Sequence, residues 1–446
     1  MTMARSPVCC DPEICLAKHL PRDVTRSALG HRRVTMNLDI TDHGKWTVRI
    51  DEGTVTYRRG GVAHPTSTVR TDAATLGDLL AGRISVADAF LSGALEIRGS
   101  MTTVLAIGGT FAPDVELPTR ARARETSAYG VHTGYLEAGD PDKRPVVLLH
   151  GLGANNSSML PVLADLASDH RVICPDLPGF GSSAAPAWRY TPEQLHRWLR
   201  AFLDAVDARG AALIGHSLGG RVALELALRD PDAVTGLVLV CPAMAFRRRR
   251  RLTSLARLLP LDVARLPLAV PPRLLHAGAR AGLRALLADP GVVPRHWYEA
   301  AADEWELSLR HASRRRALWS ALLGLYLDEP FGETGLWDRI AGLEVPALFL
   351  WGDRDTLVPA RFARHVTSAV PTARSVTLHA CGHVPQFERP EITLRLIREQ
   401  LATTAQRGAV RQRQPMSARR GARRSPHSAG ARGRRESTRS NTGRIA

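Results

Sequence analysis

A serine stands among glycines in the stretch GHSLGG, where Gly215 and Gly219 flank Ser217 at a distance of two residues. An apolar run, residues 211–215, precedes the serine, and residues 221–229 follow it with helical apolar spacing. Glycine loses entropy on folding and adds no packing, so a buried strand gains nothing from it. A sharp strand-to-helix corner does require small residues, because larger side chains would collide there. We therefore predict that Ser217 lies at such a corner, beside a helix N-terminus that favours negative charge.

A serine hydroxyl attacks a carbonyl when a base accepts its proton and an acid orients the base. When the serine stands at a strand-to-helix corner, the order along the chain is serine, acid, histidine. Asp355 and His383 meet this order downstream of Ser217. Asp353 is the alternative acid, but Asp355 stands further into the loop that follows an apolar run. His379 is expected to lie within a strand and is the poorer base.

The tetrahedral intermediate of such a reaction carries an oxyanion, which needs preorganised donors worth roughly 3 kcal/mol each. The backbone N–H of Leu218, directly after the serine, is the first candidate. The second is the N–H of Leu152 in the loop HGLG, where Gly151 and Gly153 let the backbone approach a substrate closely. This chemistry needs no cofactor, and we expect none. The cysteines at residues 9–15 lack a partner pair at zinc spacing, so we expect no metal site.

The elements that must position these groups have an α/β pattern. The continuous apolar runs VVLL, LVLV and ALFL are typical of parallel strands buried on both faces. They alternate with helical segments over residues 128–242 and 341–402, which we predict to form one doubly wound core. Residues 243–340 lack a strand pattern and are predicted to form a helical cap. Part of this cap is basic and amphipathic, so it either contacts a lipid surface or is a solvated face over a packed cap.

A second unit is predicted before the α/β core. Short alternating or β-branched segments begin at residue 34, and two short helices follow that end at Gly82 and Gly93. One more strand and a closing helix complete a small α+β domain over residues 34–111. We expect residues 1–33 to be irregular and residues 112–127 to form a polar linker.

Chain length, cysteine content and charge limit the classes of protein to which this sequence can belong. The 446 residues suffice for two domains, and the six scattered cysteines do not form a disulfide framework. Since the chain also shows neither a secretory signal nor an apolar run that could span a bilayer, we expect a cytoplasmic protein. The formal net charge is +17, but residues 406–446 hold twelve arginines and one acid and carry +11 of it. We predict that residues 403–446 form a disordered tail that contacts polyanions or acidic membranes weakly, without a specific nucleic-acid site.

The segment LGDLLAGRISVADAFLSGALEIRGSMTTVLAI resembles the sterol-carrier-protein lipid-binding domain over about residues 34–111. This resemblance implies a hydrophobic tunnel between sheet and helices that holds a lipid or fatty-acyl group. The long N-terminal helix of that family is missing or much shortened here. The alternative is a structural or dimerising module whose core is filled.

The motifs HGLG, DLPGFG, GHSLGG, WGDRDTLVP and GHVPQFERP stand in the order of the α/β-hydrolase superfamily, which residues 128–402 resemble. The resemblance implies a capped esterase- or lipase-like serine hydrolase that cleaves a hydrophobic carboxylic ester through an acyl-enzyme, and it also favours Asp355 as the acid. Relatives with an aspartate nucleophile are disfavoured by the serine at position 217. A carbon–carbon bond hydrolase, a cofactor-free peroxidase, and a lipid carrier with a non-catalytic hydrolase-like domain remain alternatives.

Overall fold

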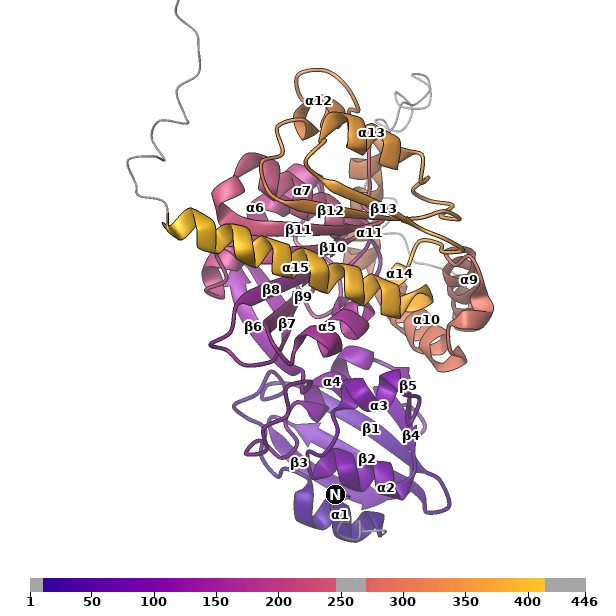
Figure 1. The fold of residues 1–446 in the computed structure, drawn as a ribbon. Helices are drawn as coiled ribbons and strands as arrows, with labels where there is room; N and C mark the ends of the chain where they lie inside the picture. Colours follow the sequence, from indigo (N-terminus) through magenta and orange to yellow (C-terminus); the bar gives the residue numbers. More distant parts are fainter. Residues whose placement is uncertain (1–10, 246–269, 414–446) are drawn as a thin grey trace, which may run out of the picture. The chain divides into compact units, whose positions relative to one another are not determined.

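The computed structural model describes residues 11–245 and 270–413. Two β-sheets organise these residues, one of five strands and one of eight (Figure 1). The arginine run at residues 247–251 and most of the basic tail lie outside the described residues, so the predicted lipid and polyanion contacts remain predictions. The described residues up to Thr404 form one compact unit.

The N-terminal module is built on the five-stranded sheet, in the order β3-β2-β1-β4-β5. All neighbouring strands are antiparallel except β1 and β4, which are parallel. Along β1, alternate residues such as Met36 and Leu38 are buried, as the sequence pattern predicts for a half-buried strand. The strands are β1 (Arg33–Ile40), β2 (Gly44–Asp51), β3 (Thr54–Arg59), β4 (Ser67–Thr71) and β5 (Leu95–Gly99).

The predicted helices of the module are present. Ser85 is the N-cap of α3, as expected, and forms a reciprocal capping box with Asp88. The helices are α2 (Ala73–Leu80), α3 (Val86–Leu91) and α4 (Met101–Gly108).

The expectation that residues 1–33 are irregular is wrong for the described part, because α1 (Pro12–His19) lies there. The Asp11 side chain caps this helix, and Pro12 stands at its start. Leu16 and Leu20 are buried against the module core, and this tertiary packing stabilises a helix whose short sequence shows no clear periodicity.

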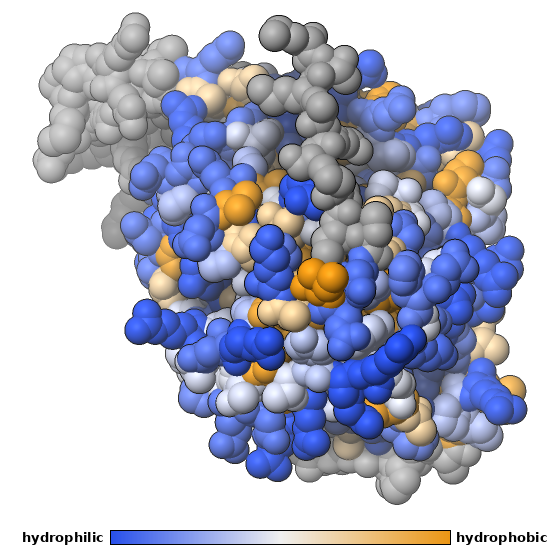
Figure 2. Space-filling model, turned by 90° about the horizontal axis from the view of Figure 1, so that it is seen from below, coloured by the Kyte–Doolittle hydropathy of each residue, from blue (hydrophilic) through white to orange (hydrophobic). Residues whose placement is uncertain are grey.

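Helix α1 helps to close the interior of the module. The cavity between sheet and helices has a volume of about 20 Å³, room for about one water molecule. Its lining includes Leu16 and Leu20 beside apolar residues of the sheet and of α2–α4. The outer surface seen from below in Figure 1 is largely hydrophilic, with small separate hydrophobic patches (Figure 2).

The eight-stranded sheet follows, in the order β13-β12-β11-β10-β8-β9-β7-β6. The six strands from β13 to β9 are parallel to one another, whereas β7 is antiparallel to both β9 and β6. The predicted linker, residues 112–127, is wrong at its C-terminal end because β6 begins at Arg122 as a polar edge strand. The strands are β6 (Arg122–Ala128), β7 (Val131–Ala138), β8 (Pro145–Leu149), β9 (Arg171–Pro175), β10 (Ala211–His216), β11 (Val234–Val240), β12 (Ala347–Gly352) and β13 (Arg374–Leu378).

Helices accompany this sheet and follow β11 as a cap. The described part of residues 243–340 contains helices and no strand of either sheet, as predicted. The expected disordered tail, residues 403–446, is wrong at its start, since the last helix continues to Arg413. The core helices are α5 (Leu160–Leu166), α6 (Pro192–Ala205), α7 (Leu218–Arg229), α13 (Phe362–Ala369), α14 (Pro385–Glu388) and α15 (Pro390–Arg413), and the cap helices are α9 (Pro272–Ala285), α10 (Arg295–Arg310), α11 (Ala312–Tyr326) and α12 (Leu336–Ile340).

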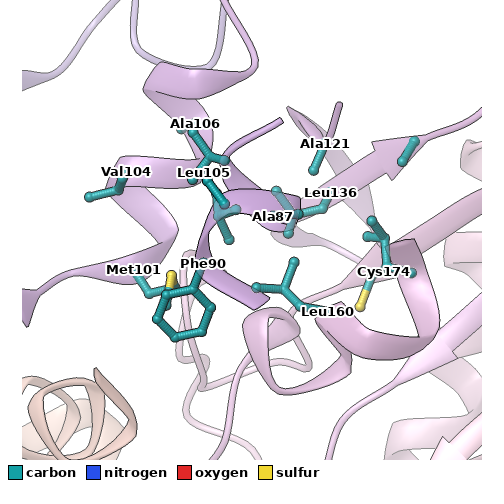
Figure 3. Close-up of a cluster of buried hydrophobic side chains, with 14 of the residues drawn as sticks. Ala87, Phe90, Met101, Val104, Leu105, Ala106, Ala121, Leu136, Leu160 and Cys174 are labelled. Atoms are coloured by element: carbon teal, nitrogen blue, oxygen red, sulfur yellow. The ribbon is translucent and has the colours of Figure 1, made fainter. Parts of the chain in front are cut away.

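One hydrophobic core joins the module to the larger sheet. Figure 3 shows Phe90 and Leu105 of the module in the same cluster as Leu136, Leu160 and Cys174 of the α/β part. These side chains are all at most 4% exposed. The two parts therefore share apolar packing rather than meeting only through polar surfaces.

The four cysteines of the described residues, Cys15, Cys174, Cys241 and Cys381, are buried. Burial raises the pKa of the Cys174 and Cys241 thiols, and it raises that of Cys381 to about 12. Among the described helices, none has the length and apolar character needed to cross a bilayer.

Candidate active site

Ser217 lies at the predicted corner between β10 and α7. Its φ of 51° and ψ of −113° are strained for a residue with a side chain. A Cβ on Gly215 would come within 2.5 Å of the Gly220 nitrogen, and one on Gly219 within 2.3 Å of the Leu149 oxygen. Only glycine fits at these two positions, which explains the spacing seen in the sequence.

Backbone hydrogen bonds hold this corner against the next strand. The Ser217 N–H donates to the Val240 carbonyl at 2.9 Å, and the Ser217 carbonyl accepts from the Ala243 N–H at 3.0 Å. Both partners belong to the end of β11 or directly follow it. The strained conformation is therefore fixed by the sheet, and the serine is half-buried at the carboxyl end of parallel strands.

Asp355 and His383 form a buried pair near this corner. The His383 Nδ1 lies 2.7 Å from Asp355 Oδ2, while Asp355 Oδ1 accepts the N–H groups of Leu357 and Val358 at 2.8 and 2.9 Å. Burial of the Asp355 carboxyl opposes its ionisation. The contact with His383 and the two N–H donors outweigh burial and leave the pKa of Asp355 below its usual value.

Asp353 has a different partner. Its Oδ2 lies 2.9 Å from Nδ1 of His379, and its Oδ1 accepts the Cys381 N–H at 3.1 Å. The expectation that His379 lies within a strand is wrong, because β13 ends at Leu378 and the His379 side chain is 89% exposed. The geometry therefore favours the pair of Asp355 and His383 over the alternative pair.

His216 connects the serine corner to the histidine loop. Its Nε2 donates to the His383 carbonyl at 2.7 Å, and the two imidazole centroids are 5.0 Å apart. Burial and the neighbouring His383 lower the pKa of His216 to about 3, so its ring is neutral at ordinary pH. Within the described residues no hydrogen bond joins the Ser217 hydroxyl to His383. Such bonds are often long before a substrate binds.

The two predicted oxyanion donors belong to the start of α7 and to the loop after β8. Leu218 is the first residue of α7, and neither its N–H nor that of Leu152 takes part in the backbone hydrogen bonds of the described residues. A Cβ on Gly151 would come within 3.3 Å of Ser217 Cβ. Gly153 has a φ of +74°, which favours glycine. The loop that carries Leu152 thus approaches the serine closely.

The sequence analysis missed Glu388, which fixes the histidine loop. Its carboxylate accepts the Gly382 N–H at 2.9 Å and the Ala288 N–H at 2.7 Å. The His383 N–H donates to the Leu286 carbonyl at 2.7 Å. The segment that follows cap helix α9 therefore lies directly on the loop of His383. The only sign of this residue in the sequence was the acid in the segment FERP. Its role could not be predicted, because its partner Ala288 lies 100 residues away in the chain.

Asp176 has a structural role in two loops. Its carboxylate accepts the N–H groups of Asn156 and Ser182, both at 2.7 Å. It therefore fixes the two loops that carry these residues.

Two groups of side chains have the composition of metal ligands. The first consists of Cys241, Asp355 and His383, and therefore overlaps the pair described above. The second consists of His276, Asp303 and Glu306, with ligand atoms within 4.8 Å of one another. Arg98 of the N-terminal module already forms an ion pair with Asp303 at 2.7 Å, so this group is part of an ion-pair network that joins the cap to the module.

Comparisons with known proteins agree with this fold. A family model described as "alpha/beta hydrolase fold" matches residues 144–390, more than half of the chain. A second model, the "SCP-2 sterol transfer family", matches residues 22–112. A solved serine hydrolase involved in carbazole degradation has a TM-score of 0.51 and 25% identity, covering 64% of this chain and 99% of that one.

Curated relatives carry several activities in their names. The dihydrolipoyllysine-residue acetyltransferase component of the acetoin cleaving system of Pseudomonas putida is 31% identical, and the match covers 58% of this chain but only 63% of that protein. Pimeloyl-(acyl-carrier protein) methyl ester esterase of Aeromonas hydrophila is 30% identical over 56% of this chain and 93% of its own length. A 2-hydroxy-6-oxo-6-(2'-aminophenyl)hexa-2,4-dienoic acid hydrolase of Metapseudomonas resinovorans is 30% identical, with coverages of 60% and 87%. With the serine corner, the histidine loop and the parallel sheet in place, the chain belongs to the α/β-hydrolase fold family.

Proposed function

We propose that this protein is a serine hydrolase that cleaves a hydrophobic carboxylic ester, or a related lipid-like acyl substrate, through an acyl-enzyme. The observation that carries the proposal is the approach of the Asp355–His383 pair to the strained corner of Ser217. The contact between His216, the residue before the serine, and the His383 carbonyl at 2.7 Å supports this approach.

The chemistry follows from the positions of these groups. Ser217 attacks the carbonyl carbon, and His383 accepts the hydroxyl proton and then donates it to the leaving alcohol. Asp355 holds the imidazole and stabilises its charged form. The N–H groups of Leu152 and Leu218 bind the oxyanion. Water, deprotonated by His383, then attacks the acyl-enzyme and releases the acid and the free serine.

A fluorophosphonate probe tests the proposal, because it phosphonylates activated serines. The full-length protein should be labelled at Ser217, and Ser217→Ala should not be labelled. Failure of the folded wild type to react would contradict the proposal and favour a lipid carrier with a non-catalytic α/β domain. Nitrophenyl esters of increasing acyl length then test the preference for lipid-like substrates.

A second candidate is a carbon–carbon bond hydrolase, which the Metapseudomonas relative favours by its name. The same three side chains would serve it. Two turnover rates would distinguish the two reactions. One is the rate for a 2-hydroxy-6-oxohexa-2,4-dienoate, measured by the loss of its absorbance, and the other is the rate for nitrophenyl esters. A kcat/KM higher for the dienoate by tenfold or more would replace the ester proposal.

A further inference from the structure

Cap helix α10 presents two consecutive acids to the N-terminal module. Asp303 accepts two hydrogen bonds from the Arg98 guanidinium, at 2.7 and 3.0 Å, and one from the Gly99 N–H at 2.8 Å. Glu304 accepts the Thr102 N–H at 3.2 Å. Charge-assisted bonds of this kind are among the strongest polar contacts in proteins. They join the end of β5 and the first turn of α4 to the cap.

The same part of the module also contacts the loop that carries the oxyanion donor. The Asn155 amide donates to the Thr102 hydroxyl at 3.4 Å. In the same loop, a Cβ on Gly153 would lie 2.7 Å from the Trp305 ring, and Trp305 directly follows Glu304. The loop is thus held between Thr102 of the module and Trp305 of the cap.

Aromatic contacts form a second connection. The His296 imidazole donates to the Phe90 carbonyl at 2.9 Å, and the Phe90 and Trp297 rings are stacked with centroids 6.2 Å apart. Trp297 in turn meets Phe387 edge to face at 4.7 Å. Because Phe387 lies on α14, directly after the loop of His383, this line of contacts runs from the module through the cap to the catalytic histidine.

We propose that the N-terminal module is a fixed wall of the active site, and that Thr102 of the module and Glu304 of the cap act as positioning residues for the oxyanion loop. This inference rests on the serine-hydrolase function proposed above. The closed interior of the module, about 20 Å³, and the core that it shares with the α/β part support a built-in role. A carrier that delivers lipid needs a larger cavity and freedom to move.

The charge of Glu304 gives this contact a pH dependence. Burial and the nearby Asp176 raise its pKa, while the N–H groups of Thr102 and Met101 and the Arg314 side chain oppose the rise, with a result of about 7. Above this pH the carboxylate is the stronger acceptor at the N-terminus of α4. The hydrogen bond from the Thr102 N–H to Glu304 therefore becomes stronger as the pH rises through neutrality.

The test uses the full-length protein and paired substitutions. Thr102→Val keeps the N–H but removes the hydroxyl, and Glu304→Leu removes the acceptor. Each should lower kcat for a short nitrophenyl ester by about tenfold to hundredfold and leave KM within about twofold, since a misplaced donor acts in the transition state. Thr102→Ser and Glu304→Gln, which keep a hydroxyl and an acceptor, should restore most of the activity. Glu306→Gln is the matched control, because Glu306 lies on the same helix but pairs with Arg310 and His276 of the cap rather than with the module.

Hydrogen exchange of the peptide that covers residues 150–156 gives a readout that does not depend on activity. It should exchange faster in Thr102→Val and Glu304→Leu than in the wild type or in Glu306→Gln. Unchanged exchange and unchanged kcat in variants that remain folded would overturn the positioning role. Absence of fluorophosphonate labelling in the wild type would instead overturn the proposed function, and the exchange result would still decide whether the module holds the loop.

Discussion

Two aspartates on one loop have different partners although only one residue separates them. Asp355 is 8% exposed and holds the buried His383, whereas Asp353 holds His379 at the surface. The sequence identified the pair of Asp355 and His383 from their order and position in the chain. It did not identify Glu388 or Glu304 as positioning residues, because the backbone partner of Glu304, Thr102, lies 202 residues away. Such a pairing depends on how distant elements meet, and local pattern carries no information about it.

Replacement of these aspartates should separate their roles. Asp355→Asn should lower kcat for a nitrophenyl ester by about 10⁴-fold, since the imidazole loses the group that orients it and stabilises its charge. Asp353→Asn should keep kcat within about threefold of the wild type, because it contacts only exposed and backbone groups. Initial rates measured under substrate saturation provide the comparison. The reverse order of effects would assign the acid to Asp353.

His216 predicts how stability depends on pH. Its folded pKa of about 3 lies below the ordinary value of 6.5, so only the unfolded state binds its proton between these limits. The corresponding stability is complete above pH 6.5 and is lost as the pH falls toward 3. Urea unfolding should therefore show that the free energy of unfolding falls as the pH is lowered from 7 to 4. In His216→Gln, the slope of this free energy against pH should be smaller by the equivalent of about one bound proton. An equal slope in both proteins would contradict the assignment.

At the scale of elements, the sequence predicted the strands with strong apolar runs and the helices with clear caps. It missed α1 and the start of β6, because α1 is stabilised by packing and β6 is a polar edge strand that pairs with β7. The serine corner was predictable because its glycines are required by backbone contacts within one short segment. Elements whose stability comes from tertiary neighbours are the ones that local pattern does not predict.

Glycines in different elements should respond in opposite directions to alanine. Gly219→Ala should destabilise the fold and abolish activity, since its Cβ would lie 2.3 Å from a backbone oxygen. Gly278→Ala on α9 should stabilise by about 1 kcal/mol, because its Cβ would meet nothing within 4 Å and alanine favours a helix. Chemical denaturation of both variants measures these changes. A destabilised Gly278→Ala would indicate that a neighbour covers this face.

At the scale of the whole molecule, the core that the module shares with the α/β part should couple their unfolding. Leu105 is 1% exposed and lies in this cluster, so Leu105→Ala should cost about 2–5 kcal/mol. The midpoint of the loss of fluorophosphonate labelling and that of the loss of helical circular dichroism should then shift together. Leu274→Ala, at a side chain that is 64% exposed, serves as the control and should change stability by at most about 0.5 kcal/mol. A labelling midpoint that stays in place would show that the module unfolds independently.

The reactivity of the buried cysteines would report on local opening of the chain. A thiol reacts as its thiolate, and those of Cys174, Cys241 and Cys381 have raised pKa values, so they meet an alkylating reagent only when the chain around them opens. All three lie in the α/β part, each on a strand of the larger sheet or shortly after one. Brief exposure to iodoacetamide after increasing times, with the alkylated peptides identified by mass spectrometry, would therefore measure how fast the chain opens around each of these cysteines. It would also show which of these surroundings opens first.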